Sequence, residues 1–314
     1  MSTVLVTGAT GLFGRALCEK LASDGHRVRA ALRVAGQMPP CVAEQVIVGA
    51  LDAGTDWSAA LDGVDAVVHL AARTHVLSDT AAQAELYSLT NAYATRSLAA
   101  AAARARVRRF VYVSSIKVNG EGSARPYATS DAPKPVDAYG KSKMLAESLL
   151  RADASEMEFA IVRPPLVYGP GVRANFLRLM QWIDEERPLP FGLVNNQRSL
   201  VNVWNVADLI ARLVTHPRAP GEVWLVSDGE GLSTRELVCR LAAALGRRPR
   251  LLPVPPIVLR CLGALAGRRQ DMRRLCDSLT VDISRTQELL EWVPPVSLDE
   301  GLARTVVWYR SGAR

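Results

Sequence analysis

The chain begins with a short apolar strand that leads directly into a glycine-rich turn and then into a helix. The stretch VLVTGATGLFGRAL places Gly8, Gly11 and Gly14 between these two elements. Glycines at this spacing let the backbone approach a pyrophosphate, which then lies over the positive N-terminus of the helix. Three spaced glycines alone are also compatible with an ordinary tight turn. At the start of a βαβ unit, however, they predict a dinucleotide site, to which Leu12 and Phe13 of the turn also belong.

Apolar, β-branched runs alternate with helical segments through the first half of the chain. Strands are expected at 3–8, 27–33, 44–49, 65–72, 109–115 and 159–165, and helices at 12–24, 57–62, 80–105 and 138–153. Strands that alternate with helices build βαβ units and therefore a parallel sheet. The predicted fold class is α/β, with a doubly wound parallel Rossmann sheet.

The pattern changes after Pro165 to amphipathic helices, short strands and proline-rich turns, including a capping box at Ser233 and Glu236. We expect a large NAD(P)-binding Rossmann domain and a smaller C-terminal substrate-binding region. The smaller region is expected to pack on the carboxyl ends of the strands, where doubly wound folds bind ligands. The predicted Rossmann domain comprises 1–170 with returning segments near 198–228, and the substrate-binding region comprises 171–197 and 229–314.

Charge and cysteine content exclude several classes of protein. The net charge of +7 comes mostly from arginines, which are scattered apart from short clusters at 104–109, 247–250 and 268–274. No continuous basic face interleaved with aromatic residues is evident, so nucleic acid is not an expected partner. Five cysteines without a CxxC motif indicate a reduced, cytoplasmic protein, and no metal site is expected. No signal peptide is evident. The apolar stretch 255–267 is too short to span a bilayer and predicts a buried helix, with a peripheral membrane contact as the alternative.

The end of the second strand normally reveals which dinucleotide is bound, because a carboxylate there accepts hydrogen bonds from the adenosine ribose of NAD. This chain has Leu32 and Arg33 at that point. Since an arginine can meet a 2′-phosphate, the predicted cofactor is NAD(P), with NADP slightly favoured; a solvated arginine is the alternative. After the third strand, Leu51 and Asp52 are candidates to contact the adenine, although Asp52 can equally be a solvated loop carboxylate.

Tyr139 and Lys143 lie four residues apart in DAYGKSKMLAE, so they share one face of a helix. The pKa of free tyrosine is about 10, and a neighbouring ammonium together with a positive nicotinamide ring would lower it. Tyr139 could then shuttle a proton to or from a substrate oxygen, while Lys143 also holds the nicotinamide ribose. Ser115, at the end of the fifth strand, would orient the same oxygen. A YxxxK pair often arises by chance, but together with the glycine turn and Ser115 it predicts a catalytic set.

Five motifs, TGATGLFG, VVHLAA, VSSIKVNG, YGKSK and RPPLVYGPG, together resemble those of the extended short-chain dehydrogenase/reductase family. Within it, the chain is similar to the NAD-dependent epimerase/dehydratase branch, whose members act on nucleotide sugars. The resemblance spans essentially the whole chain and implies the same catalytic set. It further implies that Leu70, Ala71 and Ala72 line the ribose and pyrophosphate, and that Pro164 lies near the nicotinamide carboxamide.

The resemblance also has implications for substrate and assembly. It implies that Asn175 and Arg198 contact the nucleotide diphosphate, where the alternatives are a polar residue at a helix N-terminus and a surface arginine. It implies a homodimer formed through the helices at 80–105 and 138–153. Two departures concern the adenosine contacts: no acidic residue follows the second strand, and Gly49-Ala50-Leu51 replaces the common Gly-Asp-Leu.

The residues after Ser115 limit the reactions that the protein is expected to catalyse. Family members that eliminate water carry an Asp-Glu pair there, and members that invert C3 or C5 carry a cysteine in the same loop, whereas this chain has Ile116 and Lys117. Hydride transfer at a single carbinol or ketone remains. Because the ribose carboxylate is missing, we expect an exchanging cofactor, and so a reductase.

The motifs SSIKVNGEG and PPLVYGPGVRANF most resemble 4-ketoreductases of surface-polysaccharide synthesis. The predicted reaction is therefore 4-keto reduction of a UDP-4-keto-6-deoxy-N-acetylhexosamine. The main alternative is a UDP-hexose 4-epimerase with retained NAD. A steroid- or flavonoid-type alcohol reductase is less favoured, as is a non-catalytic NAD(P)-binding protein.

Overall fold

The computed structural model of the protein describes residues 1–74, 80–153, 157–267 and 269–312. Its main sheet has seven strands in the order β3-β2-β1-β4-β5-β6-β9, and every neighbouring pair is parallel. The fold class predicted from the sequence is confirmed. The strands are β1 (Thr3–Thr7), β2 (Arg27–Leu32), β3 (Val42–Ile47), β4 (Ala66–His69), β5 (Arg109–Val113), β6 (Glu158–Arg163) and β9 (Val223–Leu225).

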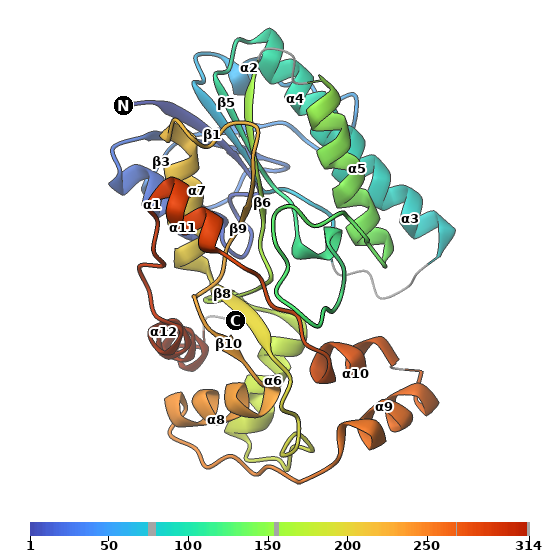
Figure 1. The fold of residues 1–314 in the computed structure, drawn as a ribbon. Coiled ribbons are helices and arrows are strands. Elements are labelled where there is room, and N and C mark those ends of the chain that lie inside the picture. The colour runs from blue at the N-terminus through green and yellow to red at the C-terminus, as the bar shows by residue number, and fades with distance from the viewer. Residues whose placement is uncertain (75–79, 154–156, 268, 313–314) are drawn as a thin grey trace.

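Helices cover both faces of this sheet (Figure 1). Val4 and Val6 of β1 point to one face and Leu5 to the other, because side chains alternate along a strand. The first face is covered by α1 (Gly14–Ser23), α7 (Val203–Thr215) and α11 (Ser284–Leu290). The second face is covered by α2 (Ser58–Leu61), α4 (Ala94–Arg104) and α5 (Ala138–Asp153). The helix α3 (Ala81–Tyr87) continues through a π-helical segment, η1 (Ser88–Tyr93), into α4.

A smaller region lies beyond the carboxyl ends of the main strands (Figure 1). The chain enters it directly, since β6 ends at Arg163 and β7 begins at Leu166. The predicted capping box is present, with the Ser233 hydroxyl and the Glu236 carboxylate each accepting from the other's backbone N–H. The region contains the sheet β10 (Gly231–Leu232), β8 (Arg198–Asn202) and β7 (Leu166–Tyr168), and the helices α6 (Ala174–Asp184), α8 (Thr234–Ala244), α9 (Pro256–Leu265), α10 (Arg269–Cys276) and α12 (Leu298–Arg310).

The C-terminal part of the chain also returns to the main sheet. The Thr286 hydroxyl of α11 donates to the carbonyl of Leu225 at 2.7 Å, and the Trp292 indole donates to Asp208 of α7 at 2.8 Å. Leu290 and Trp292 belong to the core under α1 and α7. The C-terminal part of the chain therefore packs against the main sheet as well as within the smaller region, and so it connects the two.

One expectation about the stretch 255–267 is wrong. The sequence predicted a buried helix, but α9 exposes most of its apolar side chains and buries only Leu259 and Gly263. Within the described residues, no helix has the length and apolar character needed to cross a bilayer.

A buried ion pair joins α5 to β6. Arg163 donates from Nε and Nη2 to the two carboxylate oxygens of Glu147, at 2.9 and 2.5 Å, and both side chains are 5% exposed. Two further hydrogen bonds support the pair: Ser114 donates to Glu147 at 2.5 Å, and Arg163 Nη1 donates to Asn119 at 3.0 Å. In a buried bidentate pair, the attraction between the charges offsets the free-energy cost of desolvation only when such additional hydrogen bonds are present.

We expect Glu147→Gln to lower the free energy of unfolding by roughly 3 kcal/mol, because the Arg163 charge would remain buried without its counter-charge. Glu300→Gln is the matched control, since Glu300 and Arg304 form an exposed i,i+4 pair on α12. Its loss should cost less than about 0.5 kcal/mol. Denaturant titration of both variants provides the measurement, and equal losses would contradict a structural role for the buried pair.

Candidate active site

The glycine turn is held against the loop that follows β4. Gly8 has a φ of +71°, and a Cβ atom at this position would lie 2.8 Å from the backbone nitrogen of Ala71. Only glycine accepts both this backbone conformation and this close approach. Gly11 donates its N–H to Gly8 and Gly14 donates to Gly11, at 2.9 and 3.2 Å, which closes the turn at the start of α1. The loop residues Leu70, Ala71 and Ala72 are half-buried beside it.

The same turn leaves donors available for a phosphate. Within the described part of the chain, the N–H groups of Leu12 and Phe13 make no backbone hydrogen bond, and they lie immediately before α1 begins at Gly14. Free N–H groups at the positive end of a helix suit a pyrophosphate. The residues present therefore fit the dinucleotide predicted from the sequence.

The residues predicted to contact adenosine lie at the ends of β2 and β3. Leu32 is buried, whereas Arg33 is exposed immediately after β2. Asp52 is also exposed, and its carboxylate accepts from the Gly54 N–H at 2.8 Å within a local turn, with Leu51 half-buried before it. Oδ1 of Asp52 thus stabilises the turn at residues 52–54, and Oδ2 is the oxygen that could accept a hydrogen bond from a ligand.

Lys143 lies one helical turn after Tyr139 on α5, as the sequence predicted. Its ammonium lies 6.0 Å from the centre of the Tyr139 ring and 4.7 Å from that of Tyr112. It donates to the carbonyl of Val113, the last residue of β5, at 2.8 Å. Burial lowers the pKa of Lys143 to about 7, while the negative charge of Glu147 opposes this shift. Lys143 is thus a buried cation held against a backbone carbonyl and the rings of two tyrosines.

Tyr139 is half-buried, and its pKa is raised, first by burial and then by the negative charge of Asp137. The phenol is consequently neutral in this state. Two ammonium groups lie near its ring, since Lys117 Nζ is 5.8 Å and Lys143 Nζ is 6.0 Å from the ring centre. Added positive charge beside the ring would favour the phenolate, which is what a tyrosine base requires.

Ser115 lies two residues beyond β5, at the N-cap of the short helix η2 (Ile116–Val118). Its hydroxyl accepts from the Lys117 N–H at 3.3 Å, and the side chain is half-buried. The next residue, Ile116, donates its N–H to the carbonyl of the buried Pro164 at 3.0 Å. Ser115 and Pro164 are thus held at the carboxyl ends of the neighbouring strands β5 and β6. Ser115 lies two residues after Val113, whose carbonyl accepts from Lys143.

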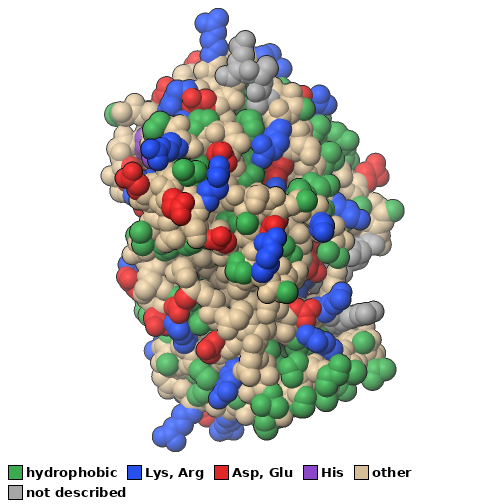
Figure 2. Space-filling view, in the orientation of Figure 1, with side chains coloured by type: hydrophobic (Ala, Val, Ile, Leu, Met, Phe, Trp, Pro, Cys, Tyr) green, Lys and Arg blue, Asp and Glu red, His purple; other side chains and the backbone are tan. Residues whose placement is uncertain are grey.

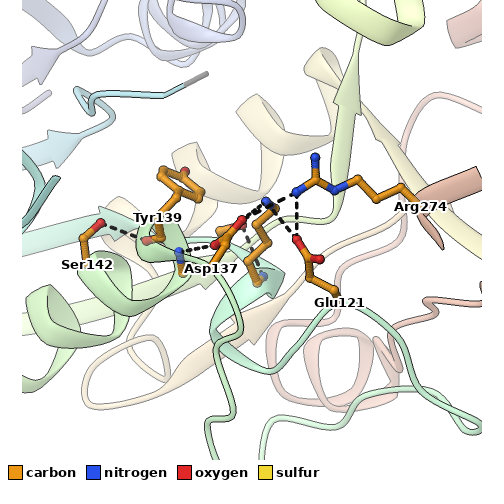
Figure 3. Close-up of polar contacts among 8 residues, drawn as sticks. Glu121, Asp137, Tyr139, Ser142 and Arg274 are labelled. Carbon is orange, nitrogen blue, oxygen red and sulfur yellow. Dashed lines mark hydrogen bonds and ion pairs between the residues drawn. The ribbon is translucent and has the colours of Figure 1, made fainter. Parts of the chain in front are cut away.

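An ion cluster adjoins Tyr139 and includes residues that the sequence did not single out. Asp137 accepts from the Gly140 N–H at 2.7 Å and pairs with Lys117. Lys117 also pairs with Glu121 at 3.2 Å, and Glu121 in turn pairs with Arg274 of α10 at 2.9 Å (Figure 3). Asp137 could have been noticed as an N-cap two residues before Tyr139. The contribution of Arg274 had no sequence signal, since only the tertiary fold brings α10 to this point.

The two residues predicted to contact the diphosphate, Arg198 and Asn175, differ in how deeply they are buried. Arg198, at the start of β8, is half-buried and donates to the Asp277 carbonyl at 3.0 Å. Its pKa is lowered by burial and by the positive charge of Arg274. Two guanidinium groups that repel one another would gain from an anion bound between them. Asn175 lies exposed in the first turn of α6.

This arrangement matches a known family. A model of the NAD dependent epimerase/dehydratase family matches residues 4–227. The chain belongs to this family. The resemblance inferred from its motifs is therefore confirmed, and the protein is an NAD-dependent enzyme of the epimerase/dehydratase type.

Individual relatives extend over almost the whole chain. The protein is 43% identical over 310 residues to a UDP-glucose 4-epimerase of Vibrio cholerae, covering 96% of this chain and 94% of the relative. It is 32% identical to a ceramide reductase of Caulobacter vibrioides, with 98% and 94% of the two chains covered. Among solved structures, MoeE5 in complex with UDP-glucuronic acid and NAD has a TM-score of 0.80 at 28% identity, covering 99% of both chains.

We expect Tyr139→Phe to reduce turnover by roughly 10²–10⁴, because the ring keeps its packing while the proton-carrying hydroxyl is lost. Affinity for the dinucleotide should change little. Tyr93→Phe is the matched control, since Tyr93 is an exposed tyrosine of the adjacent helix. Steady-state kinetics and cofactor titration of both variants provide the test, and near wild-type turnover in Tyr139→Phe would exclude this tyrosine as the proton shuttle.

Proposed function

We propose that the protein is a UDP-hexose 4-epimerase that works with retained NAD. The observation that carries the proposal is the 43% identity, over 96% of the chain, to a relative named UDP-glucose 4-epimerase. The intact residues of the site agree with it. The sequence favoured a 4-ketoreductase, and the epimerase, which was the alternative there, now takes first place.

The proposed chemistry is a reversible oxidation at C4 of the sugar. NAD held at the glycine turn would supply a reversible hydride acceptor for C4. Tyr139 takes the proton of the C4 hydroxyl through its phenolate and later gives it back, and the Ser115 hydroxyl orients the same oxygen. Lys143 stabilises the phenolate and binds the nicotinamide ribose. Asn175 and Arg198 would contact the diphosphate, and we add Arg274 to them because its charge acts on Arg198.

The residues next to Ser115 support chemistry at a single carbon. Ile116 is buried and apolar, so it offers neither an acid nor a base. Lys117 is engaged by Asp137 and Glu121. An elimination from C5 and C6 would need a further acid and base in this loop, whereas oxidation and reduction at C4 need only the tyrosine.

A 4-ketoreductase that acts on a UDP-4-keto-6-deoxy-N-acetylhexosamine in surface-polysaccharide synthesis is the second candidate. One observation favours it: β2 ends with the buried Leu32 and the exposed Arg33, so neither side chain can accept from the adenosine ribose as a carboxylate would. Weaker retention of the dinucleotide suits an enzyme that exchanges its cofactor at each turnover.

We expect the purified protein to retain NAD through dialysis and to interconvert UDP-glucose and UDP-galactose without added cofactor. An epimerase must keep its dinucleotide, because loss of NADH in mid-cycle would leave a ketosugar. The Tyr139→Phe variant is the control and should retain NAD without interconverting the sugars. A cofactor that washes out, with stoichiometric oxidation of added NADPH or NADH by the UDP-4-keto-6-deoxy sugar, would establish the reductase in place of the epimerase.

Arg33 supports a finer proposal about the cofactor, namely that the site also accommodates the 2′-phosphate of NADP. We expect Arg33→Asp to shift the preference towards NAD(H) at least tenfold, which corresponds to about 1.5–3 kcal/mol for a charged hydrogen bond. Arg235→Asp, at an exposed position in the first turn of α8, serves as a control for the change in overall charge. Unchanged binding of both dinucleotides to the Arg33 variant would show that Arg33 is merely solvated.

We also propose that the protein is a cytoplasmic homodimer. All five cysteines are free, which suits a reducing compartment. Leu86, Leu89 and Tyr93 are exposed along the continuous helical stretch from α3 to η1, within the segment expected to form the dimer interface. Exposed apolar side chains grouped on one element are typical of a surface that is covered by a partner.

A further inference from the structure

The positive charge of the chain is concentrated in one segment. Residues 247–274 contain eight arginines and a single aspartate, and this excess equals the formal net charge of +7 of the whole protein. Acidic and basic residues balance in the rest of the chain. The same segment contains no phenylalanine, tyrosine, tryptophan or histidine. Its chemistry is therefore that of aliphatic side chains surrounded by guanidinium groups.

The aliphatic side chains of this segment form an outward face on α9. Val258, Leu262 and Leu265, at positions i, i+4 and i+7, are 41%, 57% and 86% exposed, and Ile257 beside them is 62% exposed. The opposite face of the helix is buried through Leu259 and Gly263. The helix is therefore fixed to the protein on one side and presents a continuous apolar stripe on the other.

Two further leucines are exposed in the loop that leads into α9 and in the loop paired with it. Leu193 and Leu252 are also exposed, and the backbone of Leu252 is paired with Leu189 and Gly192 at 2.8 and 3.0 Å. A Cβ atom at position 192 would lie 2.8 Å from the Leu252 carbonyl, so the two loops are in close contact. Figure 2 shows hydrophobic side chains gathered at the lower right of the molecule, where Figure 1 places α9.

We propose that α9, with Leu193 and Leu252, docks on the surface of a membrane that contains anionic lipids. Helices that lie in the membrane interface have an apolar face bordered by basic residues, and each basic residue near the surface adds attraction to anionic headgroups. Arg260 lies on α9 itself, Arg248 and Arg250 precede the helix in the chain, and all three are exposed. Arg250 pairs with Glu186 and Arg260 with Asp277, so Arg248 supplies the net positive charge of this border. The proposal concerns a surface outside the catalytic set and does not depend on the proposed function.

Charge and composition favour a membrane over other partners. A second copy that bound symmetrically through this face would bring two segments of the same strong positive charge together. Single-stranded nucleic acid would be expected to stack on aromatic side chains, which the segment lacks, and a duplex would gain little from an aliphatic stripe. Anionic lipid provides both an apolar layer for the stripe and negative charge for the arginines.

The docked face is connected to the active site. α10 follows α9, and its Arg274 pairs with Glu121 in the ion cluster beside Tyr139 (Figure 3). Arg260 of α9 and Arg198 of β8 both bind Asp277, the first through the carboxylate and the second through the carbonyl. Docking would therefore hold the substrate side of the site near the membrane surface.

Vesicle sedimentation of the full-length protein tests the proposal. We expect at least a roughly tenfold higher bound fraction on phosphatidylcholine vesicles that contain about one-third phosphatidylglycerol than on pure phosphatidylcholine, with binding reduced by added salt. The double variant Leu262→Glu/Leu265→Glu should lose at least roughly tenfold in binding. Val307→Glu is the matched control, since Val307 is a 69% exposed apolar residue on α12, and it should bind as the wild type does.

Both changed leucines are exposed, so circular dichroism should show the double variant folded and its thermal unfolding midpoint should match that of the wild type. Absence of wild-type binding to anionic vesicles, or equal binding by the double variant, would overturn the proposal. A mass change in analytical ultracentrifugation that the double variant abolishes, without vesicle binding, would instead identify a second copy as the occupant. Binding to duplex DNA with the same dependence on both leucines, again without vesicle binding, would identify nucleic acid.

Discussion

The buried pair between Glu147 and Arg163 fixes the geometry on which the site depends. It joins α5 to β6, and the Ser114 hydroxyl connects the same carboxylate to the end of β5. Tyr139 and Lys143 lie two turns and one turn before Glu147 on α5, and Ser115 follows Ser114 directly. A shift of this helix along the sheet would therefore separate the tyrosine from the serine. A buried pair resists such a shift because moving one charge away from the other leaves both desolvated and uncompensated.

The pair also sets the electrostatics of the site. Burial drives the pKa of Lys143 down to about 7, and the negative charge of Glu147 limits that fall. Because Arg163 is paired with Glu147, its positive charge offsets part of the attraction between the Glu147 carboxylate and Lys143. A second pair of charges, Asp137 and Lys117, also lies close to Tyr139, and Asp137 contributes to raising the pKa of the phenol. Burial thus favours the neutral forms of both Tyr139 and Lys143, and a further positive charge in the site would favour the phenolate of Tyr139.

The change of proposed reaction from reductase to epimerase has a physical origin. The expectation of a reductase depends on the missing ribose carboxylate at Leu32 and Arg33, which concerns one contact with the dinucleotide. Retention of a dinucleotide depends on the sum of many contacts, including the free N–H groups of Leu12 and Phe13, and a single position cannot decide it. Identity of 43% over nearly the whole chain takes all of these positions into account, and the relative that shows it is named an epimerase.

The parallel sheet, the glycine turn and the shared face of Tyr139 and Lys143 could all be predicted from the sequence, because each depends on spacing within one or two neighbouring elements. The turn needs glycine at position 8 because φ there is +71°. Tyr139 and Lys143 share a face because they are one helical turn apart on α5. Three features could be known only from the folded chain: Arg274 reaches Glu121 from a distant helix, Glu147 pairs with Arg163, and α9 presents its apolar stripe to solvent. These features depend on which surfaces meet when the helices pack on the main sheet and in the smaller region. Periodicity along the chain predicts that an apolar face exists, without indicating what covers it.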